Sequence, residues 1–342
     1  MKEFSRYHRQ IILKEIGRDG QRRLDRSRVV VIGLGALGSV SANLLARAGV
    51  GTLRLIDRDL LDLHHLQRQV LYDEADAAKH LPKAIAAKQR LEKINSEIRI
   101  DAEVADVNPQ NIEGLVGDAD LIIDGTDNFE TRFLINDFSL SKKIPWIYGG
   151  ALRTEGMSFV VFPDDPPCLR CLFGGTPRQE EMQTCDQVGI LASVAHLIAS
   201  FQATEAIKIL AGLGELVDRR LWKVDIWNRQ FKSITVEHLC NTPCSGCSHD
   251  DYPYLNPESF ASGVAFCGRN TVQLYQSSDS GVNLRRLAER IPSETKVTLN
   301  PYLLNVHASP YEITVFKNGR ALIKGTEDLR RARNLYARYF EG

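Results

Sequence analysis

Four cysteines in two Cys-x-x-Cys pairs are the residues of this sequence best suited to bind a metal. Cys168 and Cys171 form the first pair, and Cys244 and Cys247 form the second. Each such turn presents two thiolates to one metal ion, so the two pairs predict a tetrahedral zinc site. Four thiolates leave no coordination position open, which predicts a structural role. The alternative is a redox dithiol, which usually occurs in a thioredoxin-like setting.

A glycine-rich segment, residues 33–38 (Gly-Leu-Gly-Ala-Leu-Gly), is a second candidate site. The β-branched residues 28–32 before it predict a strand, and residues 39–48 after it predict a helix that ends at Gly49. A loop between such elements binds phosphate through backbone amides and the helix N-terminus. Asp57 follows a further predicted strand, where its carboxylate can accept hydrogen bonds from a ribose.

The residues after Asp57 decide which nucleotide this loop is expected to bind. The glycine pattern alone is typical of nicotinamide or flavin sites. However, residues 64–69 (His-His-Leu-Gln-Arg-Gln) and Pro82-Lys83 supply fixed cations, which a hydride-transfer site rarely needs and a triphosphate does. Another predicted strand, residues 121–123, ends at Gly125-Thr126-Asp127-Asn128, which adds an acid at the same edge of the sheet.

In this order, the motifs resemble those of the ThiF/MoeB/HesA family, adenylyltransferases similar to ubiquitin-activating enzymes. The resemblance runs from about residue 4 to residue 248 and includes Arg-Tyr-His-Arg-Gln-Ile at residues 6–11. It implies that the protein uses ATP and Mg²⁺ to adenylate the C-terminal glycine carboxylate of a ubiquitin-fold sulfur carrier. The carrier would be of the ThiS or MoaD type, activated for sulfur transfer in thiamin or molybdopterin synthesis, with a cysteine desulfurase as a possible sulfur donor.

The resemblance also assigns roles to individual residues. Arg68 and Lys83 would neutralise phosphates, Asp127 would bind magnesium, and Arg9 would reach the site of the other subunit of a homodimer. Cys185 matches a position that can form a covalent link to the carrier or its sulfur, and an unreactive loop cysteine is the alternative. The implied nucleotide-binding set is Gly33, Gly35, Ala36, Gly38, Asp57, Asp59, His64, His65, Gln67, Arg68, Lys83, Asp127 and Asn128.

Two positions depart from the family pattern. Ala36 replaces a common glycine, which is harmless if only its backbone amide is used. His65 stands where the family usually has asparagine, and it can add a pH-dependent donor to the site.

The composition of the sequence argues against some binding partners and indicates a cellular compartment. Lys+Arg and Asp+Glu both number 43 in 342 residues, so no global field favours nucleic acid or an anionic membrane. The longest uncharged run, residues 187–204, contains polar side chains, which argues against a membrane span. The N-terminus lacks a signal-peptide core, and the paired cysteines suit a reducing cytoplasm.

The expected fold is α/β, with a Rossmann-like, doubly wound and largely parallel sheet and a zinc-bound C-terminal segment. Residues 1–250 would form the ATP-binding domain, and residues 251–342 a small α+β domain. A polar linker is expected over residues 248–259. A hairpin is expected over residues 312–323, followed by a helix that Thr326 caps and that runs to Phe340. The tail resembles an extra domain of some bacterial family members linked to thiamin synthesis, which favours a ThiS-type carrier.

Two other functions fit parts of the sequence. An oxidoreductase that uses a nicotinamide or flavin would need the glycines and Asp57, but it would leave Arg9, Arg68, Lys83 and Asp127 without a shared task. A non-catalytic binding scaffold of the same fold would not need these charged residues intact.

Overall fold

A computed structural model describes residues 5–175, 185–241, 244–257, 263–266, 270–275, 282–292 and 295–340. The chain divides into two compact units, Met1–Pro257 and Glu258–Gly342. The sequence placed this division after residue 250. Part of the expected linker packs on the first unit instead, because Tyr252, Tyr254 and Leu255 are apolar enough to join its core. The ring of Tyr254 stacks on that of Phe133, with centroids 5.2 Å apart.

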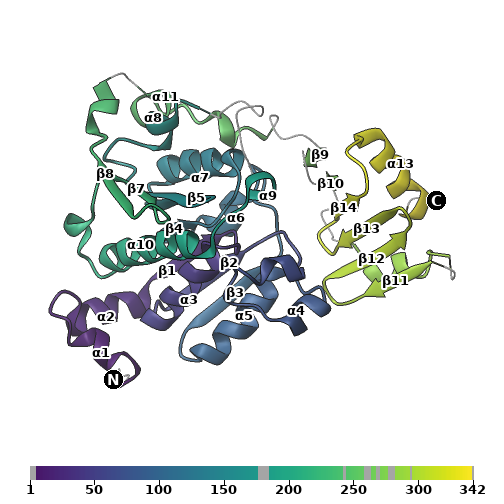
Figure 1. Cartoon of the computed structure of the whole chain (residues 1–342), viewed down its shortest axis with the longest axis horizontal. Helices are drawn as coiled ribbons and strands as arrows, with labels where there is room; N and C mark the ends of the chain where they lie inside the picture. Colours follow the sequence, from purple (N-terminus) through teal and green to yellow (C-terminus); the bar gives the residue numbers. More distant parts are fainter. Residues whose placement is uncertain are drawn as a thin grey trace. The chain divides into compact units, whose positions relative to one another are not determined.

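The first unit alternates strands and helices along most of its length (Figure 1). Its elements are η1 Ser5–Tyr7, α1 His8–Ile11, α2 Gly17–Arg26, β1 Arg28–Ile32, α3 Gly38–Ala48, β2 Thr52–Ile56, η2 Leu63–His65, α4 Glu74–Ala78, α5 Lys83–Ile94, β3 Arg99–Glu103, α6 Ile112–Val116, β4 Leu121–Asp124, α7 Phe129–Lys142, β5 Trp146–Leu152, β6 Glu155–Val161, α8 Leu169–Phe173, α9 Cys185–Val188, α10 Ala192–Leu210, η4 Gly214–Leu216, β7 Leu221–Asp225, β8 Gln230–Ile234, η5 Glu237–Asn241, α11 Ser245–His249 and η6 Pro253–Leu255.

The eight strands that the structure describes in this unit form one sheet in the order β3-β2-β1-β4-β5-β6-β7-β8. Strands β3 to β5 in this order pair in parallel, which confirms the expected doubly wound sheet. Strands β6 to β8 pair antiparallel. The direction changes after β5 because only Arg153 and Thr154 separate it from β6, and a two-residue turn joins only antiparallel neighbours.

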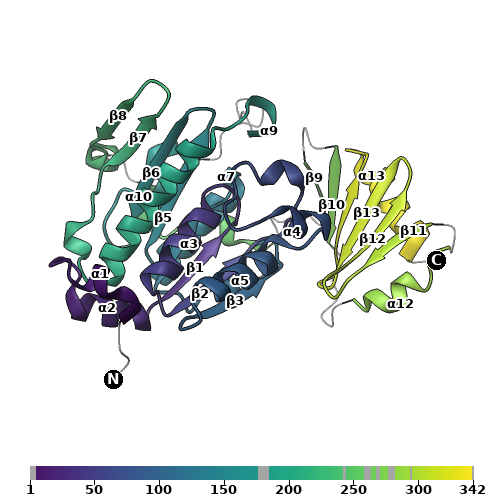
Figure 2. The same ribbon diagram turned by 60° about the horizontal axis from the view of Figure 1, so that its bottom comes forward.

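Helices cover both faces of the sheet, as Figures 1 and 2 show. Strand β1 explains why both faces need cover, because its side chains alternate between two apolar cores. Val29 and Val31 belong to the core that includes residues of α3, α5 and α10. Val30 and Ile32 belong to the core formed with α6 and α7. The strand and helix expected on either side of the glycine loop are confirmed to within one residue.

In its described residues, the second unit has a six-stranded antiparallel sheet and two helices. Its elements are β9 Gly263–Phe266, β10 Thr271–Tyr275, α12 Leu284–Ala288, β11 Lys296–Leu299, β12 Leu303–Ala308, β13 Tyr311–Phe316, β14 Arg320–Lys324 and α13 Leu329–Phe340. Strands β13 and β14 form the expected hairpin, in which Gly319 takes the left-handed conformation, with φ of 85°. The predicted cap of α13 is wrong by two residues. Asp328 accepts hydrogen bonds from the amides of Arg330 and Arg331, while Thr326 accepts one from Asp328.

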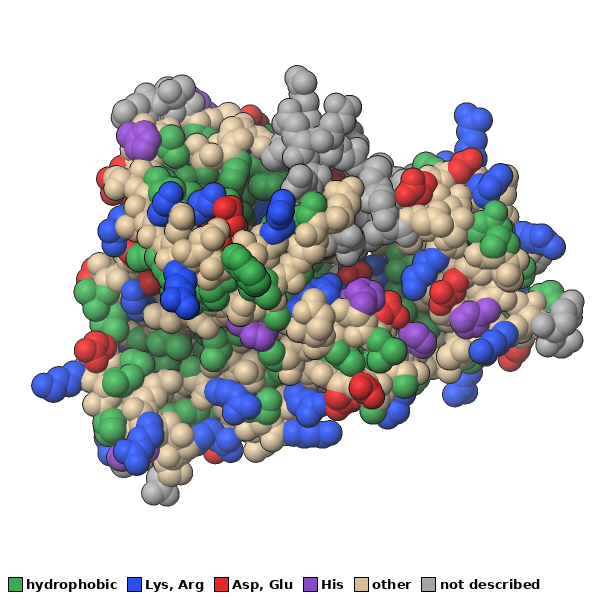
Figure 3. All heavy atoms as spheres, viewed as in Figure 1, with side chains coloured by type: hydrophobic (Ala, Val, Ile, Leu, Met, Phe, Trp, Pro, Cys, Tyr) green, Lys and Arg blue, Asp and Glu red, His purple; other side chains and the backbone are tan. Residues whose placement is uncertain are grey.

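Charge on the molecular surface is mixed in sign. Basic and acidic side chains are interspersed over much of the face drawn in Figure 3, in keeping with equal numbers of the two kinds. No helix among the described residues is long and apolar enough to cross a membrane.

Candidate nucleotide and metal sites

The glycine loop lies where the strand order of the sheet reverses. Strands β1 and β4 are neighbours, and the chain leaves them toward opposite halves of the sheet, so their following loops frame a crevice. These loops approach closely because their contact positions are glycines. A Cβ on Gly33 would lie 2.6 Å from the carbonyl oxygen of Gly125, and one on Gly125 would lie 2.3 Å from that of Gly33. Side chains at these positions would force the two loops apart.

At Gly35 the missing side chain leaves open space beside the loop and does not permit a close backbone contact. A Cβ there would meet no protein atom closer than 3.9 Å, and one of the two atoms at that distance is Nε2 of Gln69. Gln69 is buried, and its Oε1 has no hydrogen-bond partner in the part of the chain that the structure describes. The glycine loop leads directly into α3, whose N-terminus carries a partial positive charge. The open space at Gly35 and the N-terminus of α3 together fit a phosphate group of a nucleotide.

Asp57 holds the glycine loop in place. Its Oδ2 accepts a hydrogen bond from the Leu34 amide at 2.6 Å, and its Oδ1 accepts one from the Asp59 amide at 2.7 Å. Burial raises the pKa of Asp57, and the nearby Lys83 opposes that increase. The hydroxyl of Tyr72 donates to the Leu34 carbonyl at 2.9 Å, so Leu34 is fixed through both its backbone groups.

Lys83 is a buried cation at the edge of this crevice. It is the first residue of α5, and its Nζ lies 3.0 Å from Oδ2 of Asp59. Burial by itself lowers the pKa of Lys83, but Asp59 and Asp57 outweigh that effect and the pKa is raised. Lys83 is therefore charged at neutral pH. The electrostatic neighbours of Asp127 include Lys83, Arg58 and Arg132, so the structure brings this acid close to three cations.

A buried ion pair holds the backbone of the loop that carries Asp127. Asp124, the last residue of β4, accepts from Nε of Arg132 at 3.0 Å and from the amide of Thr126 at 2.8 Å. Arg132 also donates to the carbonyls of Thr126 and Gly149. Asn128, predicted to bind the nucleotide, caps α7 by accepting from the Thr131 amide at 2.8 Å.

Within residues 64–69, His65 does not have the role of a pH-dependent donor that the sequence suggested. His65 is buried, and its Nδ1 accepts a hydrogen bond from the Asp62 amide at 3.0 Å. Burial, reinforced by Lys83, lowers the pKa of His65 to about 3. The ring is therefore neutral at physiological pH, and the expected pH-dependent donor is not supported. His64 and Gln67 are exposed, while Arg68 is half-buried and donates to the His64 carbonyl at 2.8 Å.

Arg9 lies away from the glycine loop of its own chain. Its neighbour in α1, Gln10, donates to the carbonyl of Ala48, the last residue of α3, at 2.9 Å. The glycine loop is at the other end of that helix, which is roughly 16 Å long at 1.5 Å per residue. The side chain of Arg9 is exposed.

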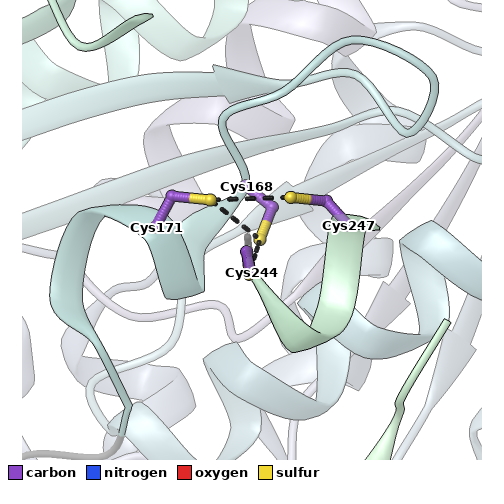
Figure 4. Close-up of side chains that lie close together, drawn as sticks. All are labelled: Cys168, Cys171, Cys244 and Cys247. Atoms are coloured by element: carbon purple, nitrogen blue, oxygen red, sulfur yellow. Dashed lines mark hydrogen bonds between the residues drawn. The ribbon is translucent and has the colours of Figure 1, made fainter. Parts of the chain in front are cut away.

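The two Cys-x-x-Cys pairs converge into one cluster, drawn in Figure 4. Its sulfur atoms lie 3.9 Å apart between Cys168 and Cys171, 3.7 Å between Cys168 and Cys244, and 3.5 Å between Cys171 and Cys247. Four sulfurs at about 2.3 Å from a tetrahedral zinc ion would be roughly 3.8 Å apart, so the cluster fits this metal. Cys168 and Cys244 occupy the N-cap positions of α8 and α11.

A buried arginine ties the two halves of this cluster together. Arg170, between the first two cysteines, donates to Oγ of Ser245 and to the Asp251 carbonyl, both at 3.0 Å. It also pairs with the buried Asp137 of α7, which accepts from the Tyr254 amide at 3.1 Å. Cys185 is the first residue of α9, and its side chain lies outside the described part of the structure.

Several residues that position the site were not predicted from the sequence. Gln69 was noticed as part of a motif, but its unpartnered oxygen beside Gly35 depends on the tertiary structure. Three side chains in helices contact backbone carbonyls of other strands or loops, namely Arg132, Gln202 and His196. An arginine, glutamine or histidine within a helix carries no local sequence signal of such a contact.

Comparison with known proteins gives consistent matches. The family model described as the ThiF family matches residues 7–246. The sulfur carrier protein ThiS adenylyltransferase of Bacillus subtilis is 39% identical over 335 residues, which cover 98% of each chain. The SAMP-activating enzyme E1 of Haloferax volcanii is 36% identical over 72% of this chain and 89% of its own. Among solved structures, E. coli MccB superposes with a TM-score of 0.60 over 69% of this chain and 70% of its own, at 23% identity, which shows a shared fold.

Proposed function

Because this chain belongs to the ThiF family and is an adenylyltransferase for a sulfur carrier, we propose that its carrier is of the ThiS type. The observation that supports this choice is the similarity to the ThiS adenylyltransferase of Bacillus subtilis over 98% of both chains. That similarity extends over the second unit, whereas the ThiF family model ends at residue 246. A MoaD-type carrier is the alternative substrate.

The proposed reaction joins the C-terminal glycine carboxylate of the carrier to the α-phosphate of ATP and releases pyrophosphate. The attacking carboxylate is already ionised at neutral pH, so the reaction needs no general base. Negative charge increases on the phosphorus centre and on the departing pyrophosphate. Fixed cations and amide dipoles that face this charge lower the barrier because they are already oriented before reaction.

Residues of this chain can supply that stabilisation. The glycine loop and the N-terminus of α3 would bind phosphate, and Asp57 beside them would accept from the ribose. Lys83 and Arg68 would neutralise phosphate charge. Lys83 is pre-oriented by Asp59, and the raised pKa keeps it protonated.

Asp127 would hold Mg²⁺, which supplies further charge neutralisation at the phosphates. Its exposed carboxylate is a hard oxygen ligand of the kind that this ion prefers. The four cysteines would hold Zn²⁺ in a closed site that stabilises the fold around α8 and α11.

We further propose that the protein acts as a homodimer in which Arg9 completes the site of the partner chain. The distance of α1 from the glycine loop of the same chain supports this arrangement.

Cys185 is the proposed site of a covalent link to the carrier. Its thiolate would attack the adenylated carboxyl carbon of the carrier, form a thioester and release AMP. A cysteine desulfurase would be the source of sulfur for the later transfer.

ATP–pyrophosphate exchange with the two carrier types in parallel tests the proposal. Exchange should depend on added carrier and be faster with the ThiS type. A ThiS-type carrier without its terminal glycine is the matched control and should give none. Equal or faster exchange with a MoaD-type carrier would contradict the ThiS assignment, and no exchange with either would contradict the proposed reaction.

A further inference from the structure

Helix α10 makes contacts with three separate parts of the candidate nucleotide site. Gln202, fully buried in this helix, donates to the carbonyls of Asp124 at 2.7 Å and Ile147 at 3.1 Å. Its Oε1 accepts from Ser41 of α3 at 3.1 Å. Gln202 therefore fixes α10 relative to the strand that leads to Asp127 and to the helix that follows the glycine loop.

His196 extends this arrangement to the third part of the site. It lies six residues before Gln202, roughly 9 Å along the helix axis. Its Nε2 lies 3.2 Å from the carbonyl oxygen of Arg68. A carbonyl oxygen only accepts hydrogen bonds, so Nε2 of His196 carries a proton and donates.

The segment that ends at Arg68 and Gln69 has mostly local hydrogen bonds. The amides of Arg68 and Gln69 both donate to the His65 carbonyl, at 3.2 and 3.1 Å, and the Arg68 guanidinium donates to the His64 carbonyl. These bonds define the shape of the turn, but they do not place it relative to the sheet. The bond from His196 connects it to an element that Gln202 has already fixed.

We propose that His196 is a positioning residue that sets the backbone of Arg68, and thereby its guanidinium, against the phosphates of ATP. The proposal rests on the proposed function, because it assumes that Arg68 contacts the nucleotide. Misplacement of a charge-stabilising group by a fraction of an ångström lowers the rate of the chemical step. His196 itself does not touch the reacting atoms.

The test compares His196→Leu, which removes the donor, with His196→Gln, which keeps a donor at similar reach. Carrier-dependent ATP–pyrophosphate exchange should fall about three- to tenfold in His196→Leu, mainly through kcat, as expected for one lost hydrogen bond. His196→Gln should recover most of this activity. Ser193→Ala, at an exposed position of the same helix, is the matched control and should match wild type.

A double-mutant cycle separates positioning from general support of the fold. In an Arg68→Ala background, His196→Leu should cause little further loss, because the group that it positions is gone. Independent, multiplicative losses would show that His196 supports the fold only and would overturn the proposal, as would a His196→Leu variant with wild-type kcat. If wild-type protein itself lacks exchange activity, the failure belongs to the proposed function and not to His196.

Discussion

Charges at the carboxyl edge of the sheet are paired with one another before any nucleotide is present. Lys83 lies against Asp59, Arg58 against Asp106 and Arg132 against Asp124. The last of these pairs is buried and holds the loop backbone, so it has a structural task. The pair of Lys83 and Asp59 borders the crevice, where an incoming phosphate would share the lysine with the aspartate. Such pairing keeps a buried cation charged and oriented, because the aspartate offsets the desolvation cost of burying the lysine.

At Asp127, the substitution Asp127→Asn should lower carrier adenylation by at least about a hundredfold, because it removes a charged ligand of the proposed magnesium ion. The protein should stay folded, with a melting temperature within about 3 °C of wild type, since the side chain is exposed and only its charge is removed. Pyrophosphate exchange at saturating Mg²⁺ measures the first effect. Asp164→Asn removes an exposed, ion-paired acid elsewhere and serves as control. Near-normal exchange by Asp127→Asn would exclude the magnesium role.

His65 predicts a pH dependence of stability. Its pKa is about 3 in the folded protein and close to 6.5 in the unfolded chain, so the unfolded chain gains a proton first as pH falls. The stability that neutral His65 contributes is complete above pH 6.5 and is lost as pH falls toward 3. From pH 7 to pH 5, wild type should lose on the order of 1 kcal/mol more unfolding free energy than His65→Asn.

Urea unfolding at several pH values measures this difference. His64→Asn, at the exposed neighbouring position, is the matched control and should follow the wild-type pH profile. Identical slopes for wild type and His65→Asn would show that the pKa of His65 is the same in the folded and unfolded protein, and that its ring is not held as the structure shows.

At the scale of elements, two very short helices depend on the cysteine cluster for their position. Helices α8 and α11 have five residues each, which is too few for stability in isolation. Each has a cysteine at its N-cap position, and Arg170 links them through Ser245. A metal ion at the sulfurs would therefore connect segments more than 70 residues apart and favour the folded state.

We predict one zinc ion per chain, bound by these four cysteines. The substitution Cys247→Ser should abolish zinc binding and lower the melting temperature by more than about 5 °C, with a smaller effect on ATP affinity. Metal analysis, thermal melts and nucleotide titration measure the three quantities. His249→Ala, at an exposed position of α11, is the control for local disturbance. Protein purified without chelator that contains no zinc and four free thiols would contradict the prediction.

At the scale of the whole molecule, Arg9 and Lys83 lie in different regions of the first unit. Lys83 borders the crevice, whereas Arg9 is on the helix that packs at the far end of α3. A single chain therefore does not bring the two cations together. In a symmetric dimer, each chain would give Arg9 to the site of its partner.

Complementation tests this arrangement. Arg9→Ala and Lys83→Ala chains should each be inactive, and an equal mixture should recover about one quarter of wild-type adenylation, because half of the dimers are mixed and each has one intact site. Subunit exchange must be complete before the assay. Mixed dimers that form but recover no activity would exclude the role of Arg9 in the partner's site.

Local sequence determined the elements and the chemical classes of the sites. Five β-branched or basic residues followed by glycines fix a strand, a loop and a helix at residues 28–48, because hydrophobic periodicity and positive φ are local properties. Cys-x-x-Cys spacing likewise restricts the ligand geometry of each pair.

Tertiary structure decided what those patterns left open. It placed residues 251–257 in the first unit and put Arg9 far from its own glycine loop. It also buried His65 as a neutral ring that accepts a hydrogen bond from the Asp62 amide. Burial and contacts between distant segments set these outcomes, and both depend on how the whole chain packs.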